Sequence, residues 1–268
     1  MAPGSPRSCG RSLTLSTFLW KREVLEALSG EGAIAFLDLP AMASTIARCG
    51  GPGFMPTGEP ARAAYRLIND LVATGDLIKV RRNLYMNMSA RPQPHPNEAA
   101  QLMHPGAIVS LHTVLGEKGI LNNPSRVVVA IVPTAIGETL KRVASSEAAT
   151  RSSDLGGIGF RFYGMTSALT EAGDETDRLD SSARYPRATP ERAIADWLYI
   201  AERSKNAPRG QRFAGLPLDS DLSGLDDGRL RRCCGDLGVT EQLDAYLERK
   251  AEADADPDVE DNTSSLGF

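Results

Sequence analysis

The sequence has few of the residues that mark a secreted or metal-dependent protein. Its 268 residues include only four cysteines and three histidines. The cysteines are Cys9, Cys49 and the adjacent pair Cys233 and Cys234, a pattern that is neither a secreted disulfide framework nor a C-x-x-C metal motif. His104 and His112 are eight residues apart with no cysteine near them, which is not the spacing of a zinc site. We therefore expect no disulfide framework and no metal.

Long apolar runs are absent as well. No stretch approaches the roughly 20 apolar residues that a helix needs to span a bilayer. The apolar stretch from Leu13 to Trp20 is short and is interrupted by serine and threonine, and it lacks the small-residue cleavage site of a secretion signal. These features predict a cytoplasmic protein with no membrane partner.

Recognisable catalytic motifs are missing too. The chain contains no G-x-S-x-G, no Walker loop and no dinucleotide fingerprint. The glycine-rich stretch 156–159 precedes a predicted strand instead of opening a helix, so it does not predict a phosphate cradle. Glu248 and Lys250 form the Glu-x-Lys of some metal-dependent nucleases, but they lie in a helical, charge-rich stretch and not on a strand. We expect a protein that is not an enzyme and has no cofactor, with nuclease activity as an alternative.

The net charge of −4 is unevenly distributed. Residues 1–90 carry 10 Lys and Arg against 7 Asp and Glu, about +3, whereas residues 236–268 carry 2 against 10, about −8. A basic N-terminal part favours a nucleic-acid partner. The acidic tail, residues 251–268, has almost no large apolar residues and is predicted to be disordered, as is the extension 1–15. The tail either keeps the protein soluble or competes with DNA for the basic part.

Residues 57–86, TGEPARAAYRLINDLVATGDLIKVRRNLYM, predict a helix followed by a β-hairpin. The helix has one apolar stripe, made of Ala64, Leu67, Ile68, Leu71 and Val72. Its opposite face carries Arg62, Arg66 and Asn69, side chains suited to phosphate oxygens and to guanine or adenine edges. Thr57, Gly58 and Pro60 give a helix start signal, and Gly75 gives a stop signal.

The hairpin that follows is predicted from residue alternation on either side of a basic turn. Leu77–Val80, which includes Lys79, and Leu84–Met86 flank the turn residues Arg81, Arg82 and Asn83. Asn83 is suited to a left-handed turn conformation. The sequence therefore places positive charge at the hairpin tip, where a solvated turn is the alternative to a DNA contact.

Two helices are expected upstream, near Thr17–Leu28 and Leu39–Ala47. The order helix, helix, helix, hairpin is that of a winged helix-turn-helix, which we assign to residues 16–90. Residues 48–59 are much longer than the usual turn of three or four residues, so the second helix is expected to be displaced or irregular. Within this domain, Arg62, Arg66 and Asn69 are the candidates for reading bases, and Lys79, Arg81 and Arg82 are the candidates for holding phosphates.

Residues 95–250 are predicted to form a mixed α/β domain, so that the whole chain is α+β. Two helical stretches are split by His104, Pro105 and Gly106, and Val127–Pro133 and Ile158–Met165 are predicted strands. Thr189, Pro190 and Glu191 start a helix that runs to about Arg203 and buries Ala193, Ile194, Trp197, Leu198 and Ala201. Residues 204–228 are expected to be loop, and Gly238–Lys250 to be the last helix.

Four segments resemble the AbiEi family, the antitoxin and repressor half of bacterial type IV toxin-antitoxin systems. They are IKVRRNLYMN, AIVSLHTVLGEKGIL (107–121), VVVAIVP and RATPERAIADWLY (187–199), and they occur in the family's order over roughly residues 20–205. The chain departs from the family at Asn83, where glycine is frequent, and over about the last 60 residues.

The resemblance implies that the chain binds double-stranded DNA of its own promoter region and represses its operon. It also implies that the C-terminal domain counters a nucleotidyltransferase-like toxin without a stable toxin complex. An alternative from the residues alone keeps the winged helix but makes the second domain a ligand-sensing or dimerisation module with no toxin partner.

Overall fold

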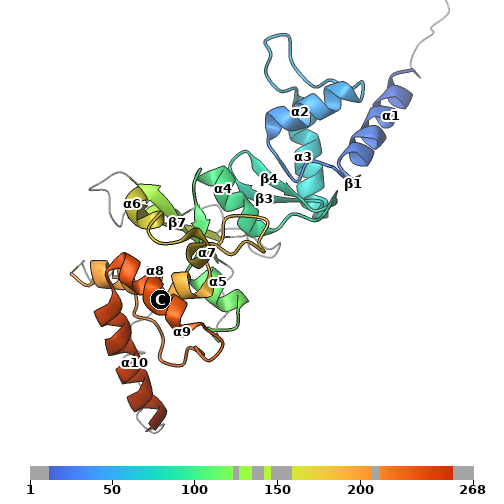
Figure 1. The fold of residues 1–268 in the computed structure, drawn as a ribbon. Helices are drawn as coiled ribbons and strands as arrows, with labels where there is room; N and C mark the ends of the chain where they lie inside the picture. Colours follow the sequence, from blue (N-terminus) through green and yellow to red (C-terminus); the bar gives the residue numbers. More distant parts are fainter. Residues whose placement is uncertain (1–11, 123–126, 135–141, 146–158, 207–211, 256–268) are drawn as a thin grey trace, which may run out of the picture. The chain divides into compact units, whose positions relative to one another are not determined.

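The computed structural model describes residues 12–122, 127–134, 142–145, 159–206 and 212–255, and they form a mixed α+β fold (Figure 1). The chain divides into two compact units, of which the first holds the described residues up to Ala99 and the second those from Ala100 onward. No helix in the described ranges combines the length and the apolar character that crossing a membrane requires.

The first unit consists of three helices and two small sheets. Its helices are α1 (Ser12–Ala27), α2 (Leu39–Arg48) and α3 (Arg62–Thr74), and a short 3-10 helix follows at Pro96–Glu98. Strands β2 (Phe36–Leu37), β3 (Leu77–Arg81) and β4 (Leu84–Asn87) form an antiparallel sheet in the order β2-β4-β3. Strands β1 (Gly30–Glu31) and β5 (Ala90–Arg91) pair in parallel.

The core of the first unit lies where the three helices meet the three-stranded sheet. Trp20 and Val24 of α1, and Leu28 directly after it, pack with Met42 and Ile46 of α2. The predicted apolar stripe of α3 is confirmed, because Ala64, Leu67, Ile68 and Leu71 are buried and Val72 is half-buried. The predicted stop is confirmed too, since Gly75 ends α3 in the left-handed conformation with a φ of 83°.

Two boundaries in this unit differ from the prediction. Helix α1 begins at Ser12, earlier than the expected Thr17, because no proline or glycine separates the two positions and a helix propagates easily once nucleated. Four residues of the predicted disordered extension are therefore helical, while residues 1–11 lie outside the described part. Helix α3 begins at Arg62, because the expected start signal around Thr57 belongs to a tight turn in the preceding loop.

The second helix was predicted to be displaced or irregular, and the structure shows that it is not irregular. Helix α2 is regular over ten residues, with Pro40 near its start. The Asp38 side chain accepts a hydrogen bond of 2.8 Å from the Ala41 amide and so caps the first turn. The long connection to α3 is accommodated by a loop, residues 49–61, that folds against α2 through Gly51 and Gly53.

The second unit is built on a four-stranded mixed sheet in the order β6-β7-β9-β8. Its strands are β6 (Ile108–Val109), β7 (Val127–Thr134), β8 (Arg142–Ser145) and β9 (Gly159–Thr166). β7 and β9 are parallel and the other pairs are antiparallel. The two predicted strands are thus confirmed, and Phe160 and Phe162 are both buried on β9.

Seven helices in the described residues of the second unit accompany the sheet. They are α4 (Ala99–Met103), α5 (His112–Glu117), α6 (Ser167–Thr170), α7 (Glu175–Arg178), α8 (Pro190–Ser204), α9 (Asp227–Leu237) and α10 (Thr240–Ala255). The predicted start of α8 is confirmed, since the Thr189 hydroxyl accepts from the Arg192 amide. Four of the five residues predicted to be buried on α8 are buried, and the fifth, Ala201, is half-buried.

Helix α9 was not predicted. Its sequence, DGRLRRCCGDL, is polar, and its buried positions are Leu230, Cys233, Cys234 and Leu237. These residues have the i, i+3, i+4, i+7 spacing of a helix, but two of them are cysteines, which pack here as small apolar side chains. Helix α10 begins at Thr240 and continues to Ala255, past the predicted end at Lys250, because strong helix formers continue and Lys250 pairs with Asp254 one turn on. The predicted tail therefore starts later, and residues 256–268 lie outside the described part.

Candidate nucleic-acid interface

The solvent face of α3 carries the three side chains that were predicted to read bases. Arg62, Arg66 and Asn69 are all exposed and lie opposite the buried stripe of the helix. They are three and four residues apart, so they are neighbours on one helical face. Within the described residues, neither arginine makes a hydrogen bond or an ion pair. Both guanidinium groups are thus available to an external anion or base edge.

The β3–β4 hairpin is anchored at its tip to the start of α2. Asn83 adopts the predicted left-handed conformation, with a φ of 59°. Its side-chain oxygen accepts a hydrogen bond of 3.0 Å from the amide of Leu39. A glycine at this position would allow the same backbone conformation but would supply no acceptor. This anchor is a function of Asn83 that the sequence reasoning missed.

The three basic residues of the hairpin differ in exposure. Lys79 and Arg82 are exposed, whereas Arg81 is half-buried at the end of β3 and makes contacts within the chain. The pairing of β3 with β4 shifts register between Lys79 and Arg81. Lys79 and Arg82 are therefore the more accessible of the predicted phosphate contacts.

A groove of about 400 Å³ separates α3 from the hairpin tip. Its lining residues are Leu39, Pro40, Pro60, Tyr65, Ile68, Asn69, Arg82, Asn83 and Tyr85. Of the six predicted contact residues, the groove brings Asn69 and Arg82 together and does not include the other four. Burial raises the pKa of Tyr85, and the neighbouring Tyr65 raises it further, so Tyr85 stays a neutral phenol.

Tyr65 is a candidate contact that the sequence reasoning missed. Its side chain is 53% exposed, although tyrosine usually packs at least its ring against the protein. Helical spacing could have identified it, because Tyr65 precedes Asn69 by one turn. An exposed phenol beside Arg82 adds both a stacking surface and a hydrogen-bonding hydroxyl to the basic groove.

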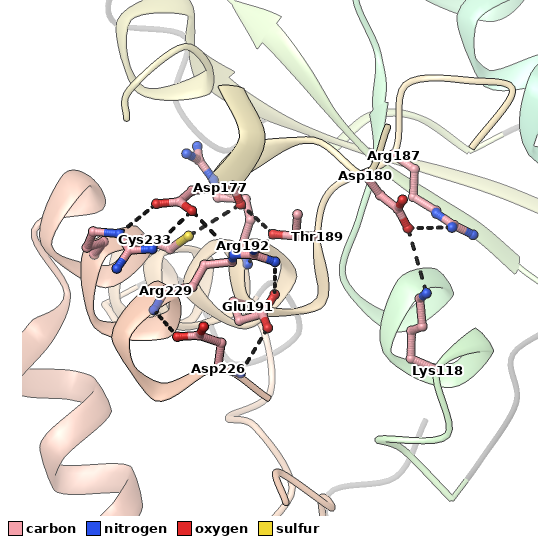
Figure 2. A network of polar contacts seen from close by, with 11 residues as sticks. Lys118, Asp177, Asp180, Arg187, Thr189, Glu191, Arg192, Asp226, Arg229 and Cys233 are labelled. Atoms are coloured by element: carbon pink, nitrogen blue, oxygen red, sulfur yellow. Dashed lines mark hydrogen bonds and ion pairs between the residues drawn. The ribbon is translucent and has the colours of Figure 1, made fainter. Parts of the chain in front are cut away.

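A different polar network lies in the second unit, and Figure 2 shows part of it around Arg192 of α8. Arg192 and Asp196, one turn apart on α8, are each 4% exposed and form an ion pair of 2.9 Å. Arg192 also donates to the carbonyls of Ala172 at 3.0 Å and Leu169 at 2.6 Å, and Asp196 accepts from the Ser110 hydroxyl at 2.7 Å. The pair thus ties the segment after β9 and the residue after β6 to α8.

Two further ion-pair groups hold the short helix α7 and the chain that follows it. Asp177 accepts from Arg232 of α9 at 2.7 Å, and this hydrogen bond is the main cause of its lowered pKa. Asp180 accepts from Arg187 at 2.5 Å and lies 3.7 Å from Lys118 (Figure 2). Its pKa is lowered chiefly by a hydrogen bond from Ser182. These carboxylates are engaged with arginines and hydroxyls, which gives them a structural role.

His112, Cys233 and Cys234 of the second unit are held in their neutral forms. Burial lowers the pKa of His112 to about 4, with the charge of Arg161 as a smaller cause. Its ring centroid lies 4.1 Å from that of Trp197. Burial also raises the pKa of both Cys233 and Cys234 to about 12. Among the residues that the structure describes, no group of three or more His, Cys, Asp or Glu is placed to hold a metal ion.

Comparisons with known proteins leave the family open. No family model and no curated protein matches the chain. Among solved structures, the chain is similar to one described as the crystal structure of RV2827C protein from Mycobacterium tuberculosis, with 12% identity and a TM-score of 0.43. The match covers 86% of this chain and 81% of that chain. A likeness this distant does not bear on function.

Proposed function

We propose that the chain is a winged-helix transcriptional repressor that binds double-stranded DNA of its own promoter region. The observation that carries the proposal is the solvent face of α3, where Arg62 and Arg66 are exposed and make no ion pair within the described chain, while Asn69 of the same face lines a groove with Arg82 of the β3–β4 hairpin. The order of helices and the sheet order β2-β4-β3 support the assignment, because a winged helix-turn-helix places its third helix and its hairpin next to each other.

The proposed roles follow from side-chain chemistry and exposure. Arg62, Arg66 and Asn69 on α3 read base edges in the major groove, where arginine pairs with guanine and asparagine with adenine. Lys79, Arg81 and Arg82 of the hairpin hold phosphates, which position the protein without reading sequence. Arg82 and Asn69 line one groove, so phosphate and base contacts meet there.

The resemblance to AbiEi proteins extends the proposal to an antitoxin. In this proposal the second unit counters a nucleotidyltransferase-like toxin in the cytoplasm without a stable complex, and it does so without enzymatic activity. Co-expression with the neighbouring nucleotidyltransferase-like gene tests this part. Growth should recover in the presence of the full chain, and the two proteins should not co-elute. If the neighbouring gene encoded a protein of another class, the antitoxin proposal would be refuted and the repressor proposal would remain.

DNA binding is tested by titrating the full chain into fluorescent duplexes. One duplex carries the DNA directly upstream of the gene and the other carries the same bases scrambled, each at two salt concentrations. Tight binding to the upstream duplex alone is expected. Three phosphate contacts predict that the logarithm of the binding constant falls with the logarithm of salt concentration with a slope of about −3 per bound chain. Equal weak binding to both duplexes, or none, would refute the repressor proposal.

A further inference from the structure

The loop between α2 and α3 exposes two large apolar side chains at its tip. Phe54 is 46% exposed and Met55 is 45% exposed. The two side chains are adjacent in sequence, so they form a small exposed apolar patch. Figure 1 shows the loop projecting away from both helices.

The base of this loop packs closely against α1 and α2, and this packing holds the tip in place. A Cβ atom on Gly53 would lie 2.1 Å from the carbonyl oxygen of Ala43, and one on Gly51 would lie 2.7 Å from Trp20 and Ile46. Both positions therefore accept only glycine. The Ala61 amide donates to the Gly53 carbonyl at 3.1 Å, which closes the loop just before α3 begins.

The tip itself is a small hairpin beside the first turn of α3. Phe54 pairs with Pro60 in an antiparallel bridge, and the amide of Met55 donates to the carbonyl of Glu59 at 2.6 Å. Pro60 in turn lines the groove that contains Asn69 and Arg82. Phe54 is thus held against Pro60, a residue that lines the proposed DNA-facing groove.

The occupant that fits this patch is DNA and not a second copy of the chain. A stable protein interface buries about 800 Å² on each partner, far more than two side chains provide. Phe54 pairs with Pro60, which lines the same groove as Arg82, so a cation that attracts phosphates belongs to the surface next to the patch. In the major groove, the apolar feature of a base pair is the methyl group of thymine, which accepts contacts from phenylalanine and other apolar side chains.

We infer that Phe54 and Met55 contact thymine methyl groups in the major groove beside α3. The inference rests on the proposed repressor function and adds a second reading element to it. While α3 reads bases through polar groups, the loop tip favours thymine at neighbouring positions through apolar contact alone.

The test compares upstream duplexes that contain either thymine or deoxyuridine, which lacks the methyl group. The wild type should bind the deoxyuridine duplex about fourfold more weakly for each methyl that it contacts. Phe54→Ala and Met55→Ala should each shrink this difference while still preferring upstream over scrambled DNA. Leu25→Ala, which removes another apolar side chain that is 43% exposed, should keep the wild-type difference.

Each other outcome has a distinct meaning. An equal thymine preference in the wild type and both tip variants, or no preference in the wild type, would overturn the inference while leaving the repressor intact. A change in oligomeric mass of the tip variants, measured by sedimentation without DNA, would assign the patch to self-association and overturn it as well. No binding of the wild type to any duplex would instead refute the repressor function on which the inference depends.

Discussion

At the scale of single residues, exposure and pairing distinguish the arginines that are open to an outside partner from those that are engaged within the chain. Arg192 has its guanidinium engaged by Asp196 and two carbonyl groups and is 4% exposed. Arg62 and Arg66 have the same chemistry but are exposed and unpaired within the described chain. Sequence periodicity predicted this difference for Arg62 and Arg66, because it fixes which face of a helix is buried.

Replacing the arginines of α3 should weaken specific binding and relax specificity. Arg62→Ala or Arg66→Ala is expected to cost about 1–3 kcal/mol on the upstream duplex and much less on scrambled DNA. Arg82→Ala should weaken both duplexes about equally and make the salt slope shallower by about 1, because a phosphate contact carries no sequence information. The measurement is fluorescence anisotropy on both duplexes over a series of salt concentrations. Equal losses on both duplexes for the Arg62 and Arg66 variants would show that α3 does not read bases.

At the scale of elements, the buried charges of the second unit fix how its helices and loops are connected. Ser110, at the end of β6, and the segment after β9 both bind the Arg192–Asp196 pair on α8. Three segments that are distant in sequence thus meet at one ion pair. Such a pair stabilises little compared with an apolar replacement, but the loss of one partner leaves the other charged and unpaired in the interior.

Removing Arg192 should therefore strongly destabilise the second unit. Arg192→Met is expected to lower the free energy of unfolding by about 3–5 kcal/mol, because among the described residues Asp196 then keeps only the Ser110 hydroxyl as a partner. Arg231→Met is the matched control, since its ion pair with Asp244 is more than half exposed on both sides. It should cost less than about 1 kcal/mol. Urea unfolding of both variants, followed by circular dichroism, makes the comparison, and similar losses would show that the buried pair has no special role.

Helices were predicted best from the sequence where a periodic apolar stripe coincides with a residue signal for the start or the end of the helix. Helix α3 has a clear apolar stripe and ends at Gly75, and α8 starts at a Thr-Pro-Glu signal, so both were found. Helix α9 was missed because half of its buried positions are cysteines. The ion pairs of Asp177 with Arg232 and of Asp180 with Arg187 have no local sequence signal, because each arginine lies on another segment. Neither the groove beside α3 nor the anchor of Asn83 on Leu39 has a local sequence signal, because the groove is lined by residues from Leu39 to Tyr85 and the anchor joins residues 44 positions apart.

At the scale of the whole molecule, each unit contains one tryptophan, so the stability of the two units can be followed separately. Trp20 is 7% exposed in the core of the first unit, and Trp197 is 1% exposed on α8 of the second. A Trp20→Phe variant therefore reports unfolding of the second unit through Trp197 fluorescence alone. This separation matters because two units need not unfold in a single transition.

The free energy of unfolding of the second unit should decrease as the pH is lowered, in two successive pH windows. The pKa of His112 is about 4 in the folded state against an ordinary value of 6.5, so its neutral form is the one that fits the fold. As pH falls from 6.5 to 4, the unfolded state takes up this proton first, which costs up to about 3 kcal/mol of stability. Asp177 and Asp180 have lowered pKa values, and their contribution is lost as pH falls below their ordinary value of 3.8.

Two variants assign the windows when unfolding free energy is measured from pH 7 to pH 3 in the Trp20→Phe background. His112→Phe keeps a ring against Trp197 but cannot take up a proton, so it should flatten the upper window and leave the lower one. Asp180→Asn should flatten the lower window and leave the upper one, because it removes a carboxylate that Arg187 and Ser182 stabilise. Glu252→Gln removes an exposed carboxylate that makes no ion pair among the described residues and should change neither window. An upper window that persists in His112→Phe would show that another group takes up the proton, and that the stacked imidazole does not control the acid stability of this unit.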